Sequence, residues 1–474
     1  MFTFEINAFS AFVRSAINIT AVASVVLFAI LWPTGYLNKF LKSIYGFESD
    51  EEVTKFSILG LCFGVIIGAY WLLRTLKDPV FYELVGRQYV PFAKFATPFL
   101  IAIVLFAIGY LSDKMKKHRL FLAVALFFGI VFAAVGIFWK MNLPELHHPL
   151  VDWIPGRALG WILYWAIELF GGAMVTGVFW AFAASTTKTV FAKRGFFLVT
   201  LGGQIGNLFG PAFNAGYATV LGNPNLVVIS AVATLLIPLV MEYYMKVLPA
   251  HMHESDDSGH KSKKTGALEG LRLIATKPFL LGVAVVSVIY EVIATIVDLQ
   301  FKYLISEVYI KEEMTAFVAF AAMASALLSI ALSLGGTKMI VDKLGVRKSL
   351  FVYPLILGAI MFGLWSFPSL WPFFVGFLIM KSFAYAFNSP IKELLYLPTS
   401  KDVKMKAKGF IDGFGGKGAK GLGSVITGML AGNLGMLLAV GGLISLVIIG
   451  FWLVVAMAVG TKYEELVEKK EIIE

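Results

Sequence analysis

Stretches of apolar residues, each followed by a shorter polar segment, recur along almost the whole chain. A helix needs roughly 20 apolar residues in a row to cross a bilayer, and twelve stretches reach or approach that length. They cover residues 56–76, 94–111, 119–139, 159–184, 196–220, 224–246, 278–301, 315–335, 349–367, 371–389, 409–430 and 434–459. The pattern predicts an all-α membrane protein with twelve transmembrane helices.

The N-terminal region adds one ambiguous apolar segment. Residues 19–31 are strongly apolar, but Arg14 and Asn18 interrupt the start of the segment. We therefore expect a helix that lies at the membrane interface rather than a thirteenth span. The expected organisation is an interfacial segment over 1–55, a six-helix bundle over 56–248, a cytoplasmic linker over 249–277, a second six-helix bundle over 278–460 and a cytoplasmic tail over 461–474.

The composition agrees with this pattern. Of the 474 residues, 58% are hydrophobic, and the mean hydropathy is +0.81, whereas soluble domains are roughly 45–50% apolar. The net charge of +10 does not indicate nucleic-acid binding, because the basic residues lie in alternate loops, where they act as topology signals. This places both ends of the twelve-helix core in the cytoplasm. We expect a monomer in a bacterial inner membrane, with no cofactor or bound metal.

The two halves of the chain repeat one another. Asp113-Lys114-Met115 follows the second span of the first half, and Asp342-Lys343-Leu344 follows the second span of the second half. Two parallel six-helix repeats are typical of major-facilitator-like carriers, which hold the solute at the membrane midplane between the repeats. The stretch from Gly109 to Arg119 is similar to their cytoplasmic loop signature. Gating or structural roles are expected for four residues: Asp78, Gly109, Asp113 and Asp342.

Charged residues inside the apolar segments are the main indication of function. Each central Lys, Arg or Asp costs about 2.5–3.5 kcal/mol on insertion scales, so such residues usually mark a polar cavity. Arg74, Lys77 and Asp78 share one face at the end of the first span. Glu168 and Glu291 lie among apolar neighbours in the fourth and seventh spans, where they could pair with lysines, orient a substrate or carry protons.

A second polar stripe follows the tenth predicted span. Lys381, Tyr385, Asn388 and Lys392 recur over three helical turns, although Pro390 must kink or break the helix. A stripe of this length is too long for lysines that only reach toward the headgroups. The stripe therefore predicts a cavity-lining face.

Helices five and eleven are rich in glycine. Gly202, Gly206 and Gly210 are four residues apart, which indicates close helix packing. Gln204 and Asn207 occupy the repeat positions of Lys417 and Lys420, so both helices are expected to line the cavity as well. Residues 414–418 lack the spacing of a phosphate-binding loop and a preceding strand, which argues against an ATPase.

Several segments resemble the nucleotide transporter family of intracellular bacteria and plastids, the ATP/ADP translocases that are unrelated to mitochondrial carriers. Residues 73–78 are similar to its Arg-Asp-Thr-Lys-Asp stretch and residues 167–171 to its Glu-Leu-Trp-Gly stretch. The segment 385–412 follows its Lys-Glu-Met-Ala-Tyr-Ile-Pro block without a gap. The resemblance covers residues 56–460.

This resemblance implies exchange of ADP for ATP, or uptake of other nucleotides, with basic residues on the phosphates. It assigns essential positions to Lys77, Glu168, Glu291 and Lys392. The sequence differs from the family pattern at Thr295, at Ser389 and over 416–420, and these differences bear on which nucleotide is preferred. Tyr385, Tyr164, Trp161 and Phe387 are candidates to stack on the base. A proton-coupled carrier of another nucleotide or organic anion is the alternative.

Overall fold

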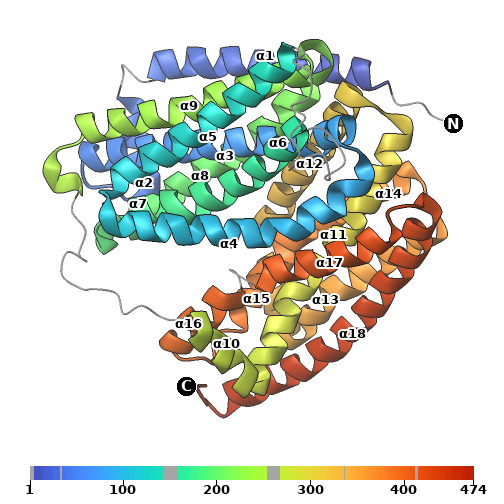
Figure 1. Cartoon of the computed structure of the whole chain (residues 1–474). Coiled ribbons are helices and arrows are strands. Elements are labelled where there is room, and N and C mark those ends of the chain that lie inside the picture. Colours follow the sequence, from blue (N-terminus) through green and yellow to red (C-terminus); the bar gives the residue numbers. More distant parts are fainter. Residues whose placement is uncertain are drawn as a thin grey trace. The chain divides into compact units, whose positions relative to one another are not determined.

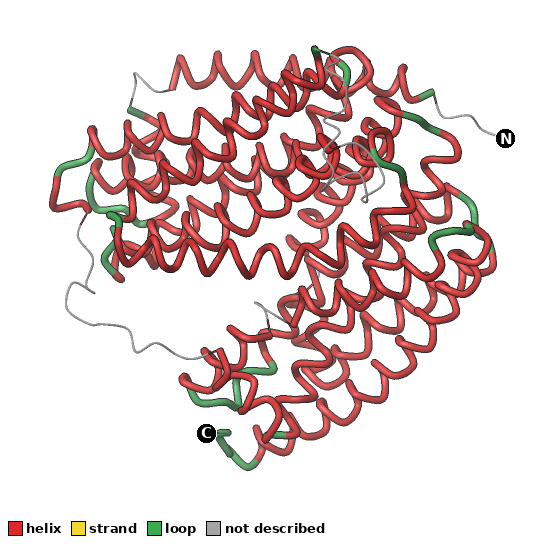
Figure 2. Tube along the Cα trace, in the orientation of Figure 1, coloured by secondary structure: helices red, strands yellow, loops and turns green. Residues whose placement is uncertain are grey.

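The computed structural model describes residues 5–31, 35–141, 158–253, 267–335, 337–411 and 415–473. These residues form helices and no strand (Figure 2). The chain divides into two compact units. Unit 1 comprises Met1–Arg87, Phe99–Lys261 and Tyr309–Met323, and unit 2 comprises Gln88–Pro98, Ser262–Val308 and Ala324–Glu474.

The first half of the chain contributes nine α-helices and three short helical segments within the described residues (Figure 1). These are α1 (Ile6–Leu31), α2 (Tyr36–Tyr45), α3 (Asp50–Leu84), η1 (Arg87–Tyr89), α4 (Val90–Lys114), α5 (Lys117–Lys140), α6 (Ala158–Phe170), η2 (Gly171–Phe179), α7 (Trp180–Ser185), α8 (Thr189–Leu221), α9 (Asn223–Val247) and η3 (Ala250–His253).

The second half contributes nine α-helices and one further segment, again within the described residues. These are α10 (Ala267–Thr276), α11 (Pro278–Val308), α12 (Lys311–Gly335), α13 (Thr337–Ser366), α14 (Leu370–Phe383), η4 (Ala384–Asn388), α15 (Ser389–Leu394), α16 (Lys401–Phe410), α17 (Gly416–Leu430) and α18 (Leu434–Glu468).

Twelve helical stretches of the described residues are long and apolar enough to cross a membrane. They include eleven of the predicted spans and one stretch of the N-terminal helix, Ile6–Ser24. The eleventh predicted span, 409–430, contains α17 of 15 residues and the positions 412–414, which lie outside the described residues. By length and composition, α1 suits a span as well as the interfacial position predicted for it.

Glycines set the closest helix packing in unit 1, between α3 and α8. A Cβ added to Gly202 would lie 2.1 Å from the Gly60 carbonyl oxygen, and one added to Gly206 would lie 2.3 Å from the Gly64 oxygen. Gly210 meets the Gly68 oxygen at 2.6 Å in the same way. The predicted packing role of the α8 glycines is confirmed, and the sequence supplies matching glycines on α3.

Ser49 fixes the start of α3. Its hydroxyl accepts a hydrogen bond from the Glu52 backbone N–H at 3.1 Å, and the first turn carries Asp50, Glu51 and Glu52. A hydroxyl cap followed by acidic residues satisfies the free backbone donors and complements the helix dipole. The 35-residue helix then runs from this cap to the charged residues at its other end.

The predicted linker is partly helical. Residues 267–276 form α10, and a Cβ on Gly270 would lie 2.5 Å from the Lys406 carbonyl oxygen of α16. One face of this stretch is therefore packed within unit 2, while Leu271 and Arg272 are exposed. Residues 254–266, which carry most of the polar side chains of the linker, lie outside the described residues.

Candidate substrate-binding site

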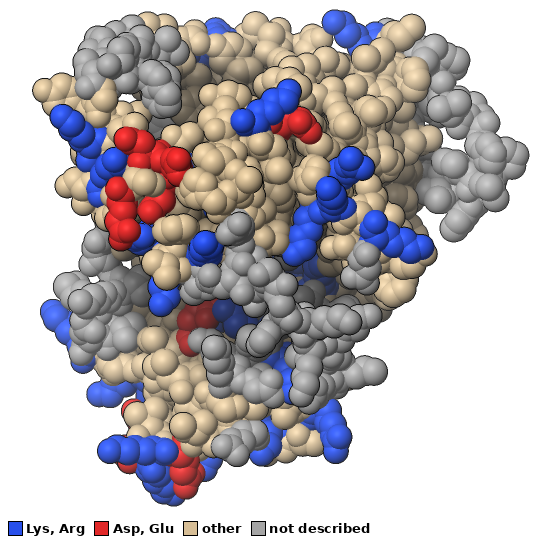
Figure 3. Space-filling model, turned by 90° about the vertical axis from the view of Figure 1, so that its left-hand side faces the viewer, with Lys and Arg blue, Asp and Glu red and all other residues tan. Residues whose placement is uncertain are grey.

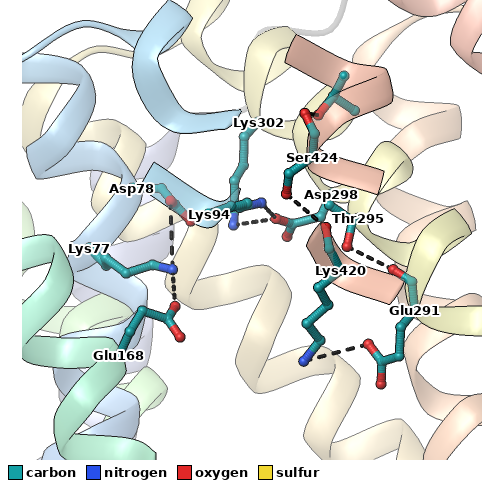
Figure 4. Close-up of polar contacts among 11 residues, drawn as sticks. Lys77, Asp78, Lys94, Glu168, Glu291, Thr295, Asp298, Lys302, Lys420 and Ser424 are labelled. Atoms are coloured by element: carbon teal, nitrogen blue, oxygen red, sulfur yellow. Dashed lines mark hydrogen bonds and ion pairs between the residues drawn. The ribbon is translucent and has the colours of Figure 1, made fainter. Parts of the chain in front are cut away.

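The charged face of unit 1 centres on Lys77, which is 6% exposed at the end of α3. Its ammonium group forms an ion pair with Glu168 of α6, and Asp78 lies 4.0 Å away (Figure 4). The same ammonium sits 4.3 Å from the centre of the Tyr164 ring. A buried cation keeps its charge only when such partners compensate for the lost water. Lys77 is therefore held inside the protein by an anion and a ring.

Arg74 lies one turn before Lys77 and is held by aromatic side chains. Its guanidinium donates to the Tyr70 hydroxyl and lies 5.0 Å from the centre of the Trp71 ring. Tyr70 in turn packs on Gly171, where a Cβ would approach the ring to 2.4 Å. The first residue of η2 must therefore be small so that Tyr70 can position Arg74.

Asn214 of α8 fixes the backbone around this face. Its side-chain amide donates to the Leu72 carbonyl and to the Thr75 hydroxyl, each at 2.7 Å, and the residue is fully buried. Sequence reasoning missed Asn214. The available signal was its position on the glycine-rich helix, 11 residues or three turns after Gly203.

Glu291 anchors the charged face of unit 2 near the middle of α11. Its carboxylate lies 3.5 Å from the Lys420 ammonium of α17 (Figure 4). Lys381 and Lys392 also act electrostatically on this carboxylate. Of the two lysines that the repeat placed on helix eleven, Lys420 is the one whose ammonium forms this ion pair, whereas Lys417 is half-buried one turn earlier.

The stripe on the tenth predicted span is only partly accessible. Lys392 donates to the Ser287 carbonyl of α11 at 3.1 Å, and Lys381 lies over the Phe377 ring. Asn388 is 5% exposed, and its amide nitrogen has no hydrogen-bond partner among the described residues. Tyr385 is 57% exposed. An unpaired buried amide is costly, so Asn388 is suited to a ligand contact.

A second carboxylate of unit 2, Asp298, joins two helices. It lies 2.7 Å from the Lys94 ammonium of α4 and 2.9 Å from that of Lys302, four residues along α11 (Figure 4). All three side chains are less than one-fifth exposed. Sequence reasoning missed Lys94, because a lysine near the start of a span resembles an ordinary interfacial residue.

The charge balance differs between the units. In unit 1, Arg74 and Lys77 accompany Asp78 and Glu168, so the described group is neutral. In unit 2, the carboxylates of Glu291 and Asp298 are outnumbered by the cations that act on them, and that set is Lys94, Lys302, Lys381, Lys392 and Lys420. Among these described residues, the positive charges therefore exceed the negative charges only in the unit 2 group.

Wide helical turns flank two of these charged groups. The π-helix η2 begins three residues after Glu168, and the π-helix η4 ends four residues before Lys392. The two segments occur in the fourth and tenth predicted spans, which correspond in the repeat. Single π-helical turns are frequent at functional sites because they leave backbone groups imperfectly bonded. Apart from Gly171-Gly172 and Pro390, the sequence gives no signal for them.

The other predicted ligand residues have varied positions. Trp161, Tyr164 and Phe387 are at most 4% exposed, and Tyr164 already packs against Lys77, so Tyr385 is the accessible candidate for base stacking. Gln204 is exposed on α8 and lines a groove beside α2. Asn207 is half-buried on α8.

The predicted gating residues have varied surroundings. Asp78 is 1% exposed beside Lys77. Gly109 lines a cavity of about 180 Å³ between α4, α5 and α7, and a Cβ added there would meet no atom within 4 Å. Asp113 and Asp342 lie in α4 and α13, but their side chains are outside the described part of the chain. α13 is broken at Gly345, which has a φ of 70°.

Comparison with solved structures identifies the fold. The chain superposes on a bacterial homologue of the iron transporter ferroportin with a TM-score of 0.62 at 12% identity, covering 87% of this chain and 100% of that one. A bacterial homologue of the lysosomal transporter Spinster gives a TM-score of 0.59 at 15% identity over 90% and 99%. Both are in inward-facing states according to their descriptions. The major-facilitator-like fold predicted from the repeat is confirmed.

Comparison with known sequences identifies relatives. The chain is 25% identical to ADP,ATP carrier protein 1 of Rickettsia prowazekii over 92% of this chain and 98% of the relative. It is 25% identical to the chloroplastic ADP,ATP carrier protein 1 of Arabidopsis thaliana over 90% and 77%, and 26% identical to ADP,ATP carrier protein 1 of Chlamydia muridarum over 83% and 84%. The family model described as "TLC ATP/ADP transporter" matches residues 34–377 and 374–463. A match of that extent, together with apolar helices that carry charged side chains, makes this chain a multi-pass membrane protein of the TLC ATP/ADP transporter family, a family of nucleotide transporters and not of enzymes.

Proposed function

We propose that the chain exchanges ATP and ADP across the membrane by alternating access, with the phosphates held in a basic cavity at the midplane. The relatives that it matches are named as ADP,ATP carriers. The lysines of unit 2 carry the proposal: five of them act on only two carboxylates, Glu291 and Asp298, and a group of cations inside spanning helices is suited to bind an anion. A nucleotide di- or triphosphate supplies several negative charges in one chain.

The proposed contacts follow from the charged faces. Lys381, Lys392 and Lys420 bind phosphate oxygens around Glu291, with Lys417 at the edge of the group. Asn388 supplies an unsatisfied buried amide beside them, and Tyr385 offers an accessible ring for the base.

In unit 1, Arg74 and Lys77 are the basic residues proposed to contact a phosphate. In the structure, Glu168 neutralises Lys77, so we propose that a phosphate group takes the place of this carboxylate when nucleotide is bound. Glu168 then balances the charge of the Lys77 ammonium when no nucleotide is bound, and the phosphate balances it when nucleotide is bound.

The charge surplus also accounts for exchange. Closing an empty cavity would remove cations that outnumber the carboxylates from water, at a cost of several kcal/mol per ion even after relaxation. A bound polyphosphate removes that cost. The loaded carrier can therefore change conformation in either direction, whereas the empty carrier returns slowly.

From the basic loops, both ends of the twelve-helix core are proposed to lie in the cytoplasm. The protein is proposed to be a monomer in a bacterial inner membrane. Four residues are proposed to act in the opening and closing of the carrier: Gly109, Asp113, Asp342 and Asp78.

Uptake by proteoliposomes tests the proposal. Labelled ATP, ADP and other nucleotides are offered to vesicles that contain ADP, that contain no nucleotide, or that contain none but carry an imposed proton gradient. Uptake that requires internal ADP supports exchange. Uptake that follows the proton gradient without internal nucleotide would instead indicate a proton-coupled carrier and overturn the proposal.

Variants sharpen this test. Lys420→Gln is expected to raise the KM for ATP at least about tenfold, since a hydrogen bond between charged groups contributes about 1.5–3 kcal/mol. Lys462→Gln is the matched control, because Lys462 lies half-exposed on α18 and pairs with Glu465 three residues away. Equal effects of the two substitutions would contradict a phosphate contact at Lys420.

A further inference from the structure

The short helix α2 has the form of a helix that lies in a membrane interface. Tyr36, Phe40 and Ile44 are four residues apart on one face, and they are 65%, 60% and 59% exposed. Lys39 and Lys42 lie on another face. An exposed apolar stripe beside basic residues is typical of helices that lie at the boundary between headgroups and acyl chains. α2 therefore marks the level of that boundary on unit 1.

Glycines at both ends hold α2 in this place. Gly35 and Gly46 have φ values of 67° and 68°, which residues with a Cβ rarely adopt. The Gly46 carbonyl also accepts a hydrogen bond from Arg194 of α8 at 3.0 Å. The end of α2 is thereby fixed against the start of α8.

A groove of about 620 Å³ opens where α2 meets α8. Its walls combine basic, aromatic and aliphatic side chains: Ile44, Tyr45, Lys193, Arg194, Phe197, Thr200, Leu201 and Gln204. Figure 3 shows the side of the molecule with this end of unit 1, where lysine and arginine side chains are spread over the surface and some lie beside a cluster of acidic side chains. The groove has one charged end and one apolar end.

The two basic residues of the groove differ in their partners. Arg194 is held by Glu48 at 2.6 Å and by Glu52 at 3.6 Å, so its charge is largely neutralised within the protein. Lys193 is exposed and forms no ion pair with any residue that the structure describes. Lys193 is therefore the cation that can meet an external anion, while Arg194 keeps the wall in place.

The apolar end of the groove continues along α8. Phe197, Leu201 and Ile205 follow one another at intervals of four residues and are 71%, 47% and 53% exposed. An exposed stripe of this kind on a spanning helix faces lipid acyl chains. The stripe begins one turn after Lys193, so a phosphate on the lysine and an acyl chain on the stripe can belong to one molecule.

We propose that this groove binds an anionic phospholipid, with its phosphate at Lys193 and an acyl chain along Phe197 and Leu201. Basic pockets beside spanning helices on the cytoplasmic side suit such headgroups. A free nucleotide phosphate shares the charge but has nothing to cover the apolar stripe. Gln204, predicted to bind substrate, lines this groove beyond Leu201, three helical turns after Lys193.

The test is lipid binding to the full-length protein in nanodiscs. Fluorescent phosphatidylglycerol is titrated against protein in a phosphatidylcholine background, and Lys193→Gln is compared with Lys116→Gln. Lys116 is an exposed lysine before α5, so both variants lose the same charge at a helix end. Lys193→Gln is expected to weaken phosphatidylglycerol binding about fivefold, and Lys116→Gln to leave it unchanged.

Two results would overturn the proposal. One is equal weakening, or none, in the two variants. The other is displacement of bound phosphatidylglycerol by ATP, together with loss of ATP binding in Lys193→Gln, which would make the groove a nucleotide site. Because the readout is lipid binding, the proposal stands or falls independently of the exchange experiment.

Discussion

The glycine contact between α3 and α8 gives a prediction that can be worked from distances. A Cβ on Gly206 would lie 2.3 Å from the Gly64 oxygen and 2.7 Å from the Gly68 nitrogen, whereas ordinary Cβ contacts begin at 3.4 Å. Gly206→Ala therefore forces the two backbones apart by about 1 Å, and overpacking of this kind costs about 1–3 kcal/mol. The flanking contacts at Gly202 and Gly210 hold the helices together, so the helices cannot easily separate near Gly206 to relieve the clash.

The matched control is Gly109→Ala on α4, where an added Cβ meets no atom within 4 Å. Both substitutions gain about 1 kcal/mol of helix propensity, so their difference isolates the steric term. We expect the thermal unfolding midpoint of Gly206→Ala in detergent to fall below that of the wild type and that of Gly109→Ala to equal or exceed it. Equal midpoints for the two variants would refute the packing argument.

Further predictions concern buried charged and polar groups. Lys55→Met removes the donor that binds the Thr186 and Met252 carbonyls at 2.5 and 2.6 Å. Each unsatisfied carbonyl costs about 1–3 kcal/mol, so the free energy of unfolding should fall by roughly 2–6 kcal/mol; an unchanged thermal midpoint would contradict these bonds. Burial, and then the nearby charge of Lys55, hold the pKa of His253 below its usual value. Unfolding therefore binds a proton, and the free energy of unfolding should fall as the pH drops below about 6.5. His253→Phe should flatten this dependence of stability on pH, and an equal dependence in both proteins would exclude the histidine as its source. Asp298→Asn should lower the midpoint more than Asp298→Glu, because it leaves two lysines without their carboxylate.

Much of the fold could be predicted because spans and glycine spacing are local patterns. The apolar stretches predicted the helices, and Gly202 with Gly206 and Gly210 predicted the helix contact. The partner side of that contact, on α3, required the structure, since spacing within one helix does not show which neighbour it meets.

The charged residues were predictable as a set but not as pairs. Charge in an apolar segment identified Lys77, Glu168 and Glu291, because the cost of burial makes such residues conspicuous. Lys420 and Lys417 could not be separated, because they are one turn apart and only the helix orientation decides between them. Lys94 was not identified, because a lysine near the start of a helix is usually an interfacial residue.

Backbone irregularities were the least predictable feature. The π-helices η2 and η4 have no local sequence pattern of their own beyond Gly171-Gly172 and Pro390. Their matching positions in the two repeats became visible only in the structure.

Equilibrium binding of ATP, ADP, AMP and adenosine to the purified protein tests the central claim most directly, since the claim is that surplus lysines hold a phosphate chain. Affinity should rise with the number of phosphates, and Lys381→Gln combined with Lys392→Gln and Lys420→Gln should abolish that dependence. Adenosine binding as tightly as ATP, or a triple variant with unchanged preference for ATP, would contradict the account.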